Sequence, residues 1–168
     1  MSRPTEPASG PAALAPFVHH RRIPWGGTDA ARIAYTARFL DFAIEVIEAW
    51  FHDRLGQSFY KLNLDEGIGT PFVRIELNFR SSLTPRDLLE TEVLLLRLGR
   101  SSLHIGVAGR AGERLAYEGR LVCAFVDVGS PRMRPIPVPE KYRAALQREA
   151  ALAAARLQAD SAVSDLRT

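Results

Sequence analysis

The chain has 168 residues, of which 46% are hydrophobic and 24% are charged. These values are typical of one globular domain that is long enough to bury a substantial core. The formal net charge is +3, but 20 of the 22 basic residues are arginines scattered singly, without a lysine- or arginine-rich run. A nucleic-acid binder gathers its charge in a patch or stripe, so we predict no nucleic-acid partner. Local arginines can still hold the phosphates of a small ligand.

The first 16 residues contain four prolines and no compact apolar run. This composition predicts a disordered tail over residues 1–16 of a cytoplasmic protein, not a signal peptide. No apolar stretch approaches the ~18 residues that a membrane span needs, so we expect no membrane association.

Cys123 is the only cysteine and falls in an apolar strand pattern, which favours a buried, inert thiol over a reactive nucleophile.

The first predicted strand, Phe17–Pro24, carries His19 and His20. Neighbouring strand residues point to opposite faces, which is poor geometry for holding one metal ion. We therefore expect no metal, and no cofactor. A turn follows with the Gly26-Gly27 pair and Asp29. Asp29 stands several residues before the next helix, where an acid is available for chemistry; a helix N-cap is the structural alternative for it.

A long amphipathic helix is predicted next, beginning near Thr36 and ending between His52 and Gly56. Its apolar residues recur at helical spacing and form one stripe: Phe39, Phe42, Ala43, Val46, Ile47 and Trp50. The opposite face is polar and carries Asp41 and Glu45, for which solvated carboxylates are the default. Because no later segment shows so clear a helical period, this helix should supply the core on which the strands pack.

Four strand patterns joined by short turns come after an irregular stretch, 54–69, that is interpreted as a loop or short helix. They are Pro71–Arg80, Leu88–Leu98, Ser101–Ala108 and Arg114–Val128. In the first of them apolar residues alternate with polar ones, the pattern of a half-buried antiparallel strand. Long strands after one helix predict a single antiparallel sheet curled around that helix, an α+β domain. A C-terminal helix follows the Pro139-Glu140-Lys141 opening.

Motifs of other enzyme classes are missing: no nucleophile elbow, no phosphate-binding P-loop and no zinc-protease motif occurs. The stretch RIPWGGTDAARIAY, from Arg22 to Tyr35, resembles the signature of the 4-hydroxybenzoyl-CoA thioesterase family. That signature reads basic, Ile/Val, four residues, Thr/Cys, Asp, two residues, Gly, Ile/Val, Val. Five of its positions are matched here, by Arg22, Ile23, Thr28, Asp29 and Ile33. Three positions depart from the family, since Gly27 replaces a common acid, Arg32 replaces Gly and Ala34 replaces Val.

Further segments are similar to the family, so that the resemblance covers about residues 22–142. GIGTPF, from Gly67 to Phe72, looks like the segment in which the family's Thr borders the acyl pocket, here Thr70. The turn Gly99-Arg100-Ser101-Ser102 resembles the family's turn that binds the CoA phosphates. Arg134 matches a further phosphate-binding arginine. From the residues alone, each of these arginines could equally be a solvated turn residue.

The resemblance implies a hot-dog fold, in which an antiparallel sheet wraps around one long helix, over residues 17–145. Residues 146–168 would form a C-terminal helical extension and tail. The resemblance also implies a homodimer or homotetramer, because a single hot-dog subunit leaves a sheet edge and a groove open. It also implies that Asp29 is the catalytic acid, as nucleophile or general base, and that the backbone N–H of Thr36 at the helix start is the oxyanion hole.

The resemblance thus implies an acyl-CoA thioesterase that acts on an aromatic acyl group. It also implies substrate contacts by Thr70, Arg100, Ser101, Ser102 and Arg134. A short- or medium-chain aliphatic acyl-CoA thioesterase is the alternative within the enzymes. An alternative of another class is a non-catalytic hot-dog module that binds acyl-CoA or a protein. Position in the chain favours Asp29 over Asp41 and Glu45 as the catalytic acid, although one thioesterase branch uses a glutamate on the helix.

Overall fold

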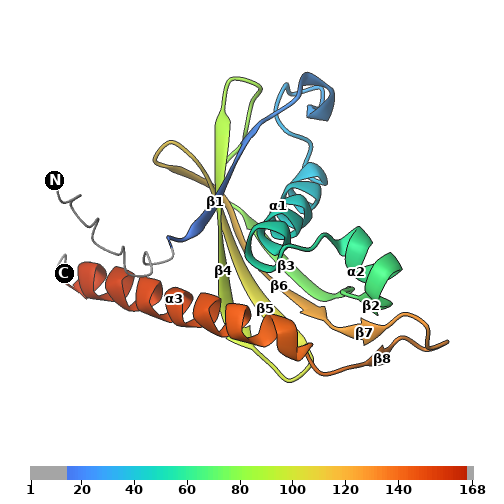
Figure 1. The fold of residues 1–168 in the computed structure, drawn as a ribbon. Helices are drawn as coiled ribbons and strands as arrows, with labels where there is room; N and C mark the ends of the chain where they lie inside the picture. Colours follow the sequence, from blue (N-terminus) through green and yellow to red (C-terminus); the bar gives the residue numbers. More distant parts are fainter. Residues whose placement is uncertain (1–14, 166–168) are drawn as a thin grey trace, which may run out of the picture.

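A five-stranded antiparallel sheet forms the body of the molecule, in the order β1-β4-β5-β6-β3 (Figure 1). The computed structural model describes residues 15–165, the last six by their backbone only; the predicted tail 1–16 lies outside this range except for its last two positions. The strands are β1 (Phe17–Arg22), β3 (Phe72–Phe79), β4 (Leu88–Leu98), β5 (Ser102–Ala111) and β6 (Arg114–Ala124). Every neighbouring pair is antiparallel, as the alternating patterns and short turns predict.

The long helix α1 (Arg38–Leu55) packs against one face of this sheet and closes the core. All six residues of the predicted apolar stripe are buried, together with Phe51. Full burial of side chains of this size stabilises the fold by roughly 2 kcal/mol each. The helix ends at Gly56, which takes the left-handed conformation (φ 68°) that closes many helices. It starts two residues after Thr36, so that Thr36 lies in the turn before the helix.

A small second sheet and a short helix flank the C-terminal half of α1. Helix α2 (Phe59–Glu66) leads into β2 (Ile68–Gly69), which pairs with β7 (Val126–Asp127) and through it with β8 (Arg134–Pro135). Of the two interpretations of residues 54–69, the short helix is confirmed, and a two-residue strand follows it. The predicted strand Arg114–Val128 is also interrupted, because β6 ends at Ala124 and the chain then joins the second sheet as β7.

The C-terminal helix α3 (Glu140–Asp165) runs along β4 at the flank of the main sheet (Figure 1). Its buried Glu149 links it to α1, since this carboxylate accepts a hydrogen bond from Trp50 Nε1 at 3.0 Å and lies 3.1 Å from Arg54 Nε. The extra layer explains why β4 carries a continuous apolar run, Val93–Leu96, instead of strict alternation. None of the helices in residues 15–165 is long and apolar enough to cross a membrane.

The edge strand β3 exposes apolar side chains. The alternation over residues 71–80 predicts a half-buried strand, and the strand is confirmed, but Val73, Ile75 and Phe79 are 63%, 40% and 50% exposed. β3 is the last strand of the sheet, and a register shift between Phe72 and Arg74 interrupts its pairing with β6. A long apolar edge with unpaired backbone groups is a surface that natural proteins normally cover.

Candidate active site

Asp29 lies in a short hairpin that leads from β1 to α1. Thr28 and Ala34 form an antiparallel bridge across the hairpin, and the N–H of Asp29 donates to the carbonyl of Ile33 at 3.0 Å. The Asp29 carboxylate accepts a hydrogen bond from the N–H of Ala31 at 2.8 Å through Oδ1 and is exposed to solvent. One carboxylate oxygen thus orients the side chain, and the other is available to a substrate.

Arg32 adopts the left-handed conformation, with φ at 63°. This is the position at which the signature that the chain resembles has glycine, and only glycine takes that conformation without steric cost. Arg32 pays about 1 kcal/mol for it. The hairpin keeps its shape because the N–H of Arg32 donates to the carbonyl of Asp29 at 2.9 Å. The departure from glycine therefore adds a cationic side chain beside Asp29 and leaves the turn intact.

An open pocket of about 720 Å³ surrounds Asp29. It lies between the hairpin and the loop before β4, and its lining consists of Trp25, Asp29, Ala30, Arg32, Thr84, Pro85 and Arg86. A hydrogen bond of 2.7 Å from the N–H of Ala34 to the carbonyl of Leu83 joins the two loops. Sequence reasoning missed the second loop as part of the site, because the Thr84–Asp87 segment carries only a turn signal.

The loop before β4 is held in place by Asp87. Its carboxylate accepts hydrogen bonds from the N–H and the hydroxyl of Thr84, at 2.6 and 2.9 Å, and pairs with Arg114 at 2.9 Å. Burial opposes ionisation of this carboxyl, but the contacts with Thr84 and Arg114 outweigh burial, and its pKa is lowered from 3.8. A carboxylate whose pKa is lower in the folded state stabilises that state at any pH above the pKa of the unfolded chain. The contribution is lost as the pH falls through the pKa of the folded state.

Asp87→Asn is expected to lower the free energy of unfolding by about 1 kcal/mol at pH 7, because the neutral amide cannot pair with Arg114. The difference from wild type should shrink as the pH falls below 3.8 and through the lowered pKa of the folded state, where the wild-type carboxyl also becomes protonated. Urea unfolding of both proteins at pH 7 and pH 3 measures this. Asp41→Asn is the control, since Asp41 forms an exposed pair with Arg38 on one helical turn. A loss that is equal at both pH values contradicts the assignment.

Thr36 lies directly before the N-terminus of α1. Its backbone N–H donates to no other group in the described part of the chain. The carbonyl of its neighbour Tyr35 accepts from Arg38 at 2.8 Å, and the N–H of Tyr35 donates to Gly27 at 2.9 Å, which ties the helix start to the base of the Asp29 hairpin. An unpaired N–H at the positive end of a helix can hydrogen-bond a developing oxyanion.

The other predicted contacts gather at the opposite end of the main sheet. Thr70 is buried and lines a mainly apolar pocket of about 340 Å³ with Ile44, Phe59, Phe72 and Val126 among its walls. Arg100, Ser101 and Ser102 lie at the turn between β4 and β5. The carbonyls of Arg100 and Ser101 accept hydrogen bonds from Val138 and Phe125, both at 2.8 Å, so that this turn packs beside the segment that follows Arg134 in β8.

The structure therefore brings the predicted residues together in two groups. Asp29 and Thr36 form the first, and the second consists of Thr70, Arg100, Ser101, Ser102 and Arg134. Strand β3 connects the two ends of the molecule, because it begins beside Thr70 and ends at Phe79, whose ring packs on that of Phe39 in the first turn of α1 at 5.2 Å. On one chain Asp29 and Thr70 line different pockets, and the other predicted site residues line neither of the two.

Comparison with known protein families gives a match over residues 23–146, to the model of the thioesterase-like superfamily. This chain belongs to the thioesterase-like superfamily.

Solved structures agree with this membership. A thioesterase-superfamily protein from Jannaschia sp. CCS1 is 34% identical, with a TM-score of 0.75 and coverage of 84% of this chain and 97% of that one. A 1,4-dihydroxy-2-naphthoyl-CoA thioesterase from Synechocystis is 17% identical (TM-score 0.71, 79% and 96% covered). A gentisyl-coenzyme A thioesterase is 22% identical (TM-score 0.67, 76% and 99% covered). The hot-dog fold is thereby confirmed. No protein of curated function matches the chain.

In this thioesterase-like chain the two acids of α1 that were weighed against Asp29 are engaged on the surface. Asp41 pairs with Arg38 at 3.0 Å, and Glu45 pairs with Arg21 of β1. Neither lines the pocket that holds Asp29.

The predicted buried thiol is confirmed as well, since Cys123 is fully buried and burial raises its pKa to about 12. A thiol with that pKa is protonated at neutral pH and is no nucleophile.

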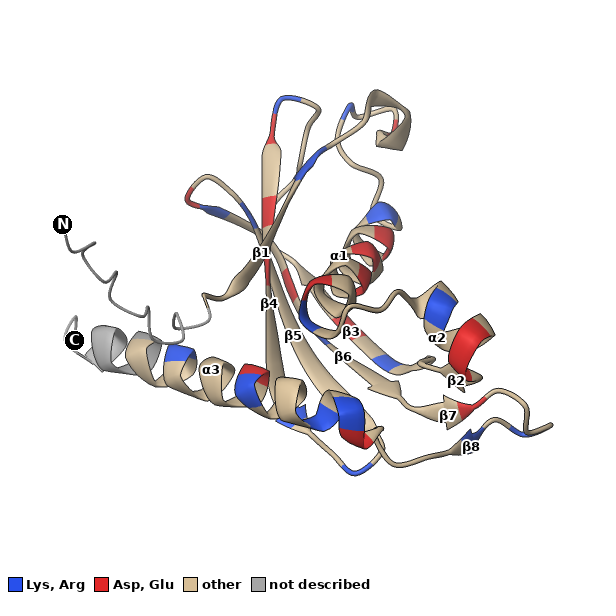
Figure 2. Cartoon of the chain, in the orientation of Figure 1, with Lys and Arg blue, Asp and Glu red and all other residues tan. Residues whose placement is uncertain are grey.

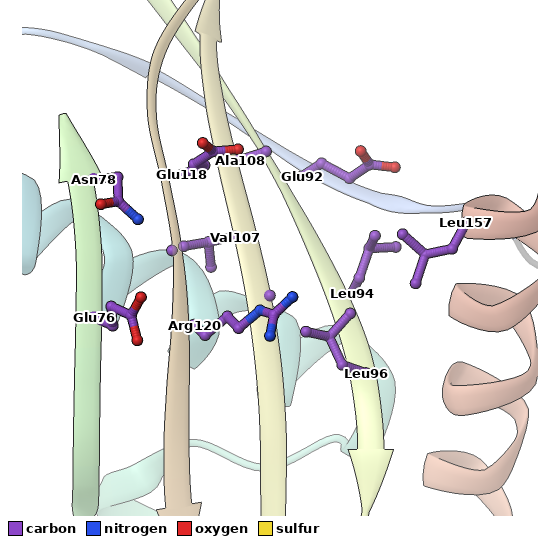
Figure 3. Close-up of a pocket in the computed structure, with 12 residues that line it drawn as sticks. Glu76, Asn78, Glu92, Leu94, Leu96, Val107, Ala108, Glu118, Arg120 and Leu157 are labelled. Carbon is purple, nitrogen blue, oxygen red and sulfur yellow. The ribbon is translucent and has the colours of Figure 1, made fainter. Parts of the chain in front are cut away.

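A further hollow of about 420 Å³ lies on the main sheet beside α3, and Leu157 contributes to its wall (Figure 3). Its three carboxylates are already engaged, as Glu76 pairs with Arg74, Glu118 with Arg80 and Glu92 with Arg156. None of the predicted site residues lines it. Among residues 15–159, whose side chains the structure describes, no group of three His, Cys, Asp or Glu could hold a metal ion. The pocket around Asp29 is therefore the stronger candidate for chemistry.

Proposed function

We propose that this protein hydrolyses acyl-CoA thioesters, with an aromatic acyl group as the favoured substrate. One observation carries the proposal: an exposed carboxylate, Asp29, is held in a rigid hairpin that leads directly to the unpaired N–H of Thr36 at the start of α1. An acid beside a helix N-terminus is sufficient for acyl transfer from a thioester, because a thiolate leaves without a strong general acid.

In the nucleophilic route, Asp29 attacks the thioester carbonyl carbon, the C–S bond breaks, and the CoA thiolate leaves and is protonated by solvent. Water then hydrolyses the mixed anhydride to the free acid and restores the carboxylate. In the general-base route, Asp29 takes a proton from the water that attacks the carbonyl directly. Both routes place negative charge on the carbonyl oxygen, which the Thr36 N–H would stabilise; one such donor contributes roughly 3 kcal/mol.

The second group of residues supplies the rest of the proposed site. The apolar pocket bordered by Thr70 would hold the acyl group, and Arg100, Ser101, Ser102 and Arg134 would contact the phosphates of CoA. The naphthoyl-CoA and gentisyl-CoA thioesterases among the structural neighbours act on aromatic acyl groups, which supports the aromatic preference. Resemblance to the 4-hydroxybenzoyl-CoA thioesterases points the same way.

A homodimer would unite the two groups. The exposed edge β3 can pair antiparallel with β3 of a second copy about a two-fold axis, covering Ile75 and Phe79. Antiparallel pairing places the Phe79 end of one strand opposite the Phe72 end of the other. Asp29 and Thr36 of one protomer then approach the Thr70 group of its partner, and each dimer has two composite sites.

A panel of acyl-CoAs tests the activity, with released CoA measured by a thiol reagent that Cys123, being buried, does not consume. We expect kcat/KM for benzoyl-CoA and 4-hydroxybenzoyl-CoA to exceed that for butyryl- and octanoyl-CoA by about tenfold or more, because an acyl pocket discriminates by shape and apolar contact. Preference for the aliphatic thioesters would support the alternative specificity. No release of CoA from any of them would favour a binding module.

A further inference from the structure

Two arginines, Arg32 and Arg86, line the pocket of Asp29, and neither has an acidic partner in the part of the chain that the structure describes. Neither guanidinium forms an ion pair among the described residues, and Asp29 is the one acid in the lining of this pocket. Two cations and one anion give the pocket a net positive charge. Basic segments occur on both loops that border it (Figure 2). Because an unpaired guanidinium binds a carboxylate or phosphate in two parallel hydrogen bonds, the pocket is suited to an anionic group.

Both arginines stand on loops that are already ordered. Arg32 is fixed by the hydrogen bonds of the Asp29 hairpin, and Arg86 by its own N–H, which donates to the Thr84 hydroxyl at 3.3 Å, and by the Asp87 contacts that hold the turn. The Ala34–Leu83 hydrogen bond joins the two loops at 2.7 Å. Little backbone ordering is therefore needed when an anion binds between them.

The backbone of Arg32 gives independent support. A non-glycine residue at φ 63° is strained, and strain of this kind is retained where the side chain has a use. Glycine would relieve the strain at no cost to the turn. Arg32 thus stands where glycine would fit the backbone more easily, and it places a guanidinium directly beside Asp29, the proposed catalytic acid.

Resting on the function proposed above, we propose that Arg32 and Arg86 bind a carboxylate carried by the acyl group. The substrate class would be the mono-CoA thioesters of aromatic dicarboxylic acids. In the composite site proposed above, the acyl ring would lie between the partner protomer's Thr70 pocket and the apolar side chains of Trp25 (72% exposed) and Pro85, so that its carboxylate reaches Arg32 and Arg86. CoA phosphates are the other source of an anion. They are separated from the thioester by the whole pantetheine arm, whereas Arg32 and Arg86 share one pocket with Asp29, which favours the acyl carboxylate.

Binding of non-hydrolysable thioethers tests the proposal without requiring turnover. The probes are 4-carboxybenzyl-CoA and its neutral isostere 4-carbamoylbenzyl-CoA, and the same pair built on N-acetylcysteamine, which has no phosphates. We expect wild type to bind the carboxylate about tenfold or more tightly than the amide in both series. Arg32→Gly and Arg86→Gln should reduce this preference to about twofold or less, because each removes one charged contact.

A stability measurement and a control variant separate loss of the anion contact from misfolding. Arg32→Gly should unfold at no lower temperature than wild type, since glycine suits the turn, and Arg148→Gln on the exposed side of α3 serves as a control that should keep the full preference. Equal binding of acid and amide by wild type overturns the proposal. The proposal is also overturned if the arginine variants lose equal affinity for both CoA ligands and bind the N-acetylcysteamine ligands as wild type does. That result would mean that the two arginines contact the CoA phosphates. If wild type hydrolyses acyl-CoAs but binds the acid and the amide equally, this inference alone is overturned. If wild type prefers the acid but hydrolyses no acyl-CoA, the hydrolase assignment alone is overturned.

Discussion

Asp29→Asn is expected to lower kcat by ~10³ or more with little change in KM, because the amide is neither a nucleophile nor a base. The loop should keep its shape, since the side-chain oxygen of asparagine can still accept the hydrogen bond from the N–H of Ala31. Steady-state kinetics with the best thioester of the panel measures the effect. Urea unfolding at pH 7 should show a stability close to that of wild type, which separates chemistry from folding.

The helix acids provide matched controls for this substitution. Asp41→Asn and Glu45→Gln should each remain within about tenfold of wild-type kcat, an allowance of roughly 1.4 kcal/mol for indirect effects. Glu45 pairs with Arg21 of β1, so that a small loss of stability in Glu45→Gln would reflect that contact. Near-normal turnover of Asp29→Asn together with loss of turnover in Glu45→Gln would move the chemistry to the helix and place the protein with the glutamate branch of thioesterases.

An equal mixture of two inactive variants should recover about a quarter of wild-type activity if each site uses residues of both protomers. One variant is Asp29→Asn. The other carries Arg100→Glu and Arg134→Glu, which replace two exposed cations by anions and should lower kcat/KM by ~10² through repulsion of the CoA phosphates. In a mixed dimer one of the two sites combines the intact Asp29 of one protomer with the intact arginines of the other. Half of the dimers are mixed, and each has one intact site.

Co-expression of the two chains with different affinity tags isolates the mixed dimer, and its activity should be about half that of the wild-type dimer. An activity no higher than the average of the two parent variants would mean that each site lies within one chain. Full activity of the double arginine variant alone would remove these residues from the phosphate contact. Ile75→Arg on the β3 edge gives a second check, because a charge there should yield a monomer with reduced turnover.

The sequence alone was sufficient for the elements that carry a strong period. The stripe from Phe39 to Trp50 predicted α1 and its buried face, because a helix in contact with a sheet must repeat its apolar residues every three to four positions. The bounds of β4, Leu88–Leu98, were predicted correctly because turn residues delimit the strand on both sides. Asp29 could be singled out for two reasons. It lies in the loop before α1, and it belongs to the stretch that resembles a family signature.

The stretch 54–69 was left open between a loop and a short helix because the local signal of short elements is weak. Helix α2 has one buried apolar residue, Leu62, so that its pattern does not stand out from a loop. Its N-cap was a readable signal that was missed, as the side chain of Ser58 accepts a hydrogen bond from the N–H of Lys61 at 3.2 Å. The break between β6 and β7 at Phe125 is set by pairing with β2 and β8, partners that are distant in sequence.

The composition of the pocket around Asp29 was decided by the tertiary structure. Arg86 lies more than fifty residues after Asp29 in the sequence, and the contact between Ala34 and Leu83 brings its loop to the hairpin. Likewise, nothing in the alternation of residues 71–80 distinguishes an edge strand from a central one, because period two reports which side chains share a face and not whether a neighbour covers them. Strand order depends on contacts between distant segments, and local sequence patterns do not contain that information.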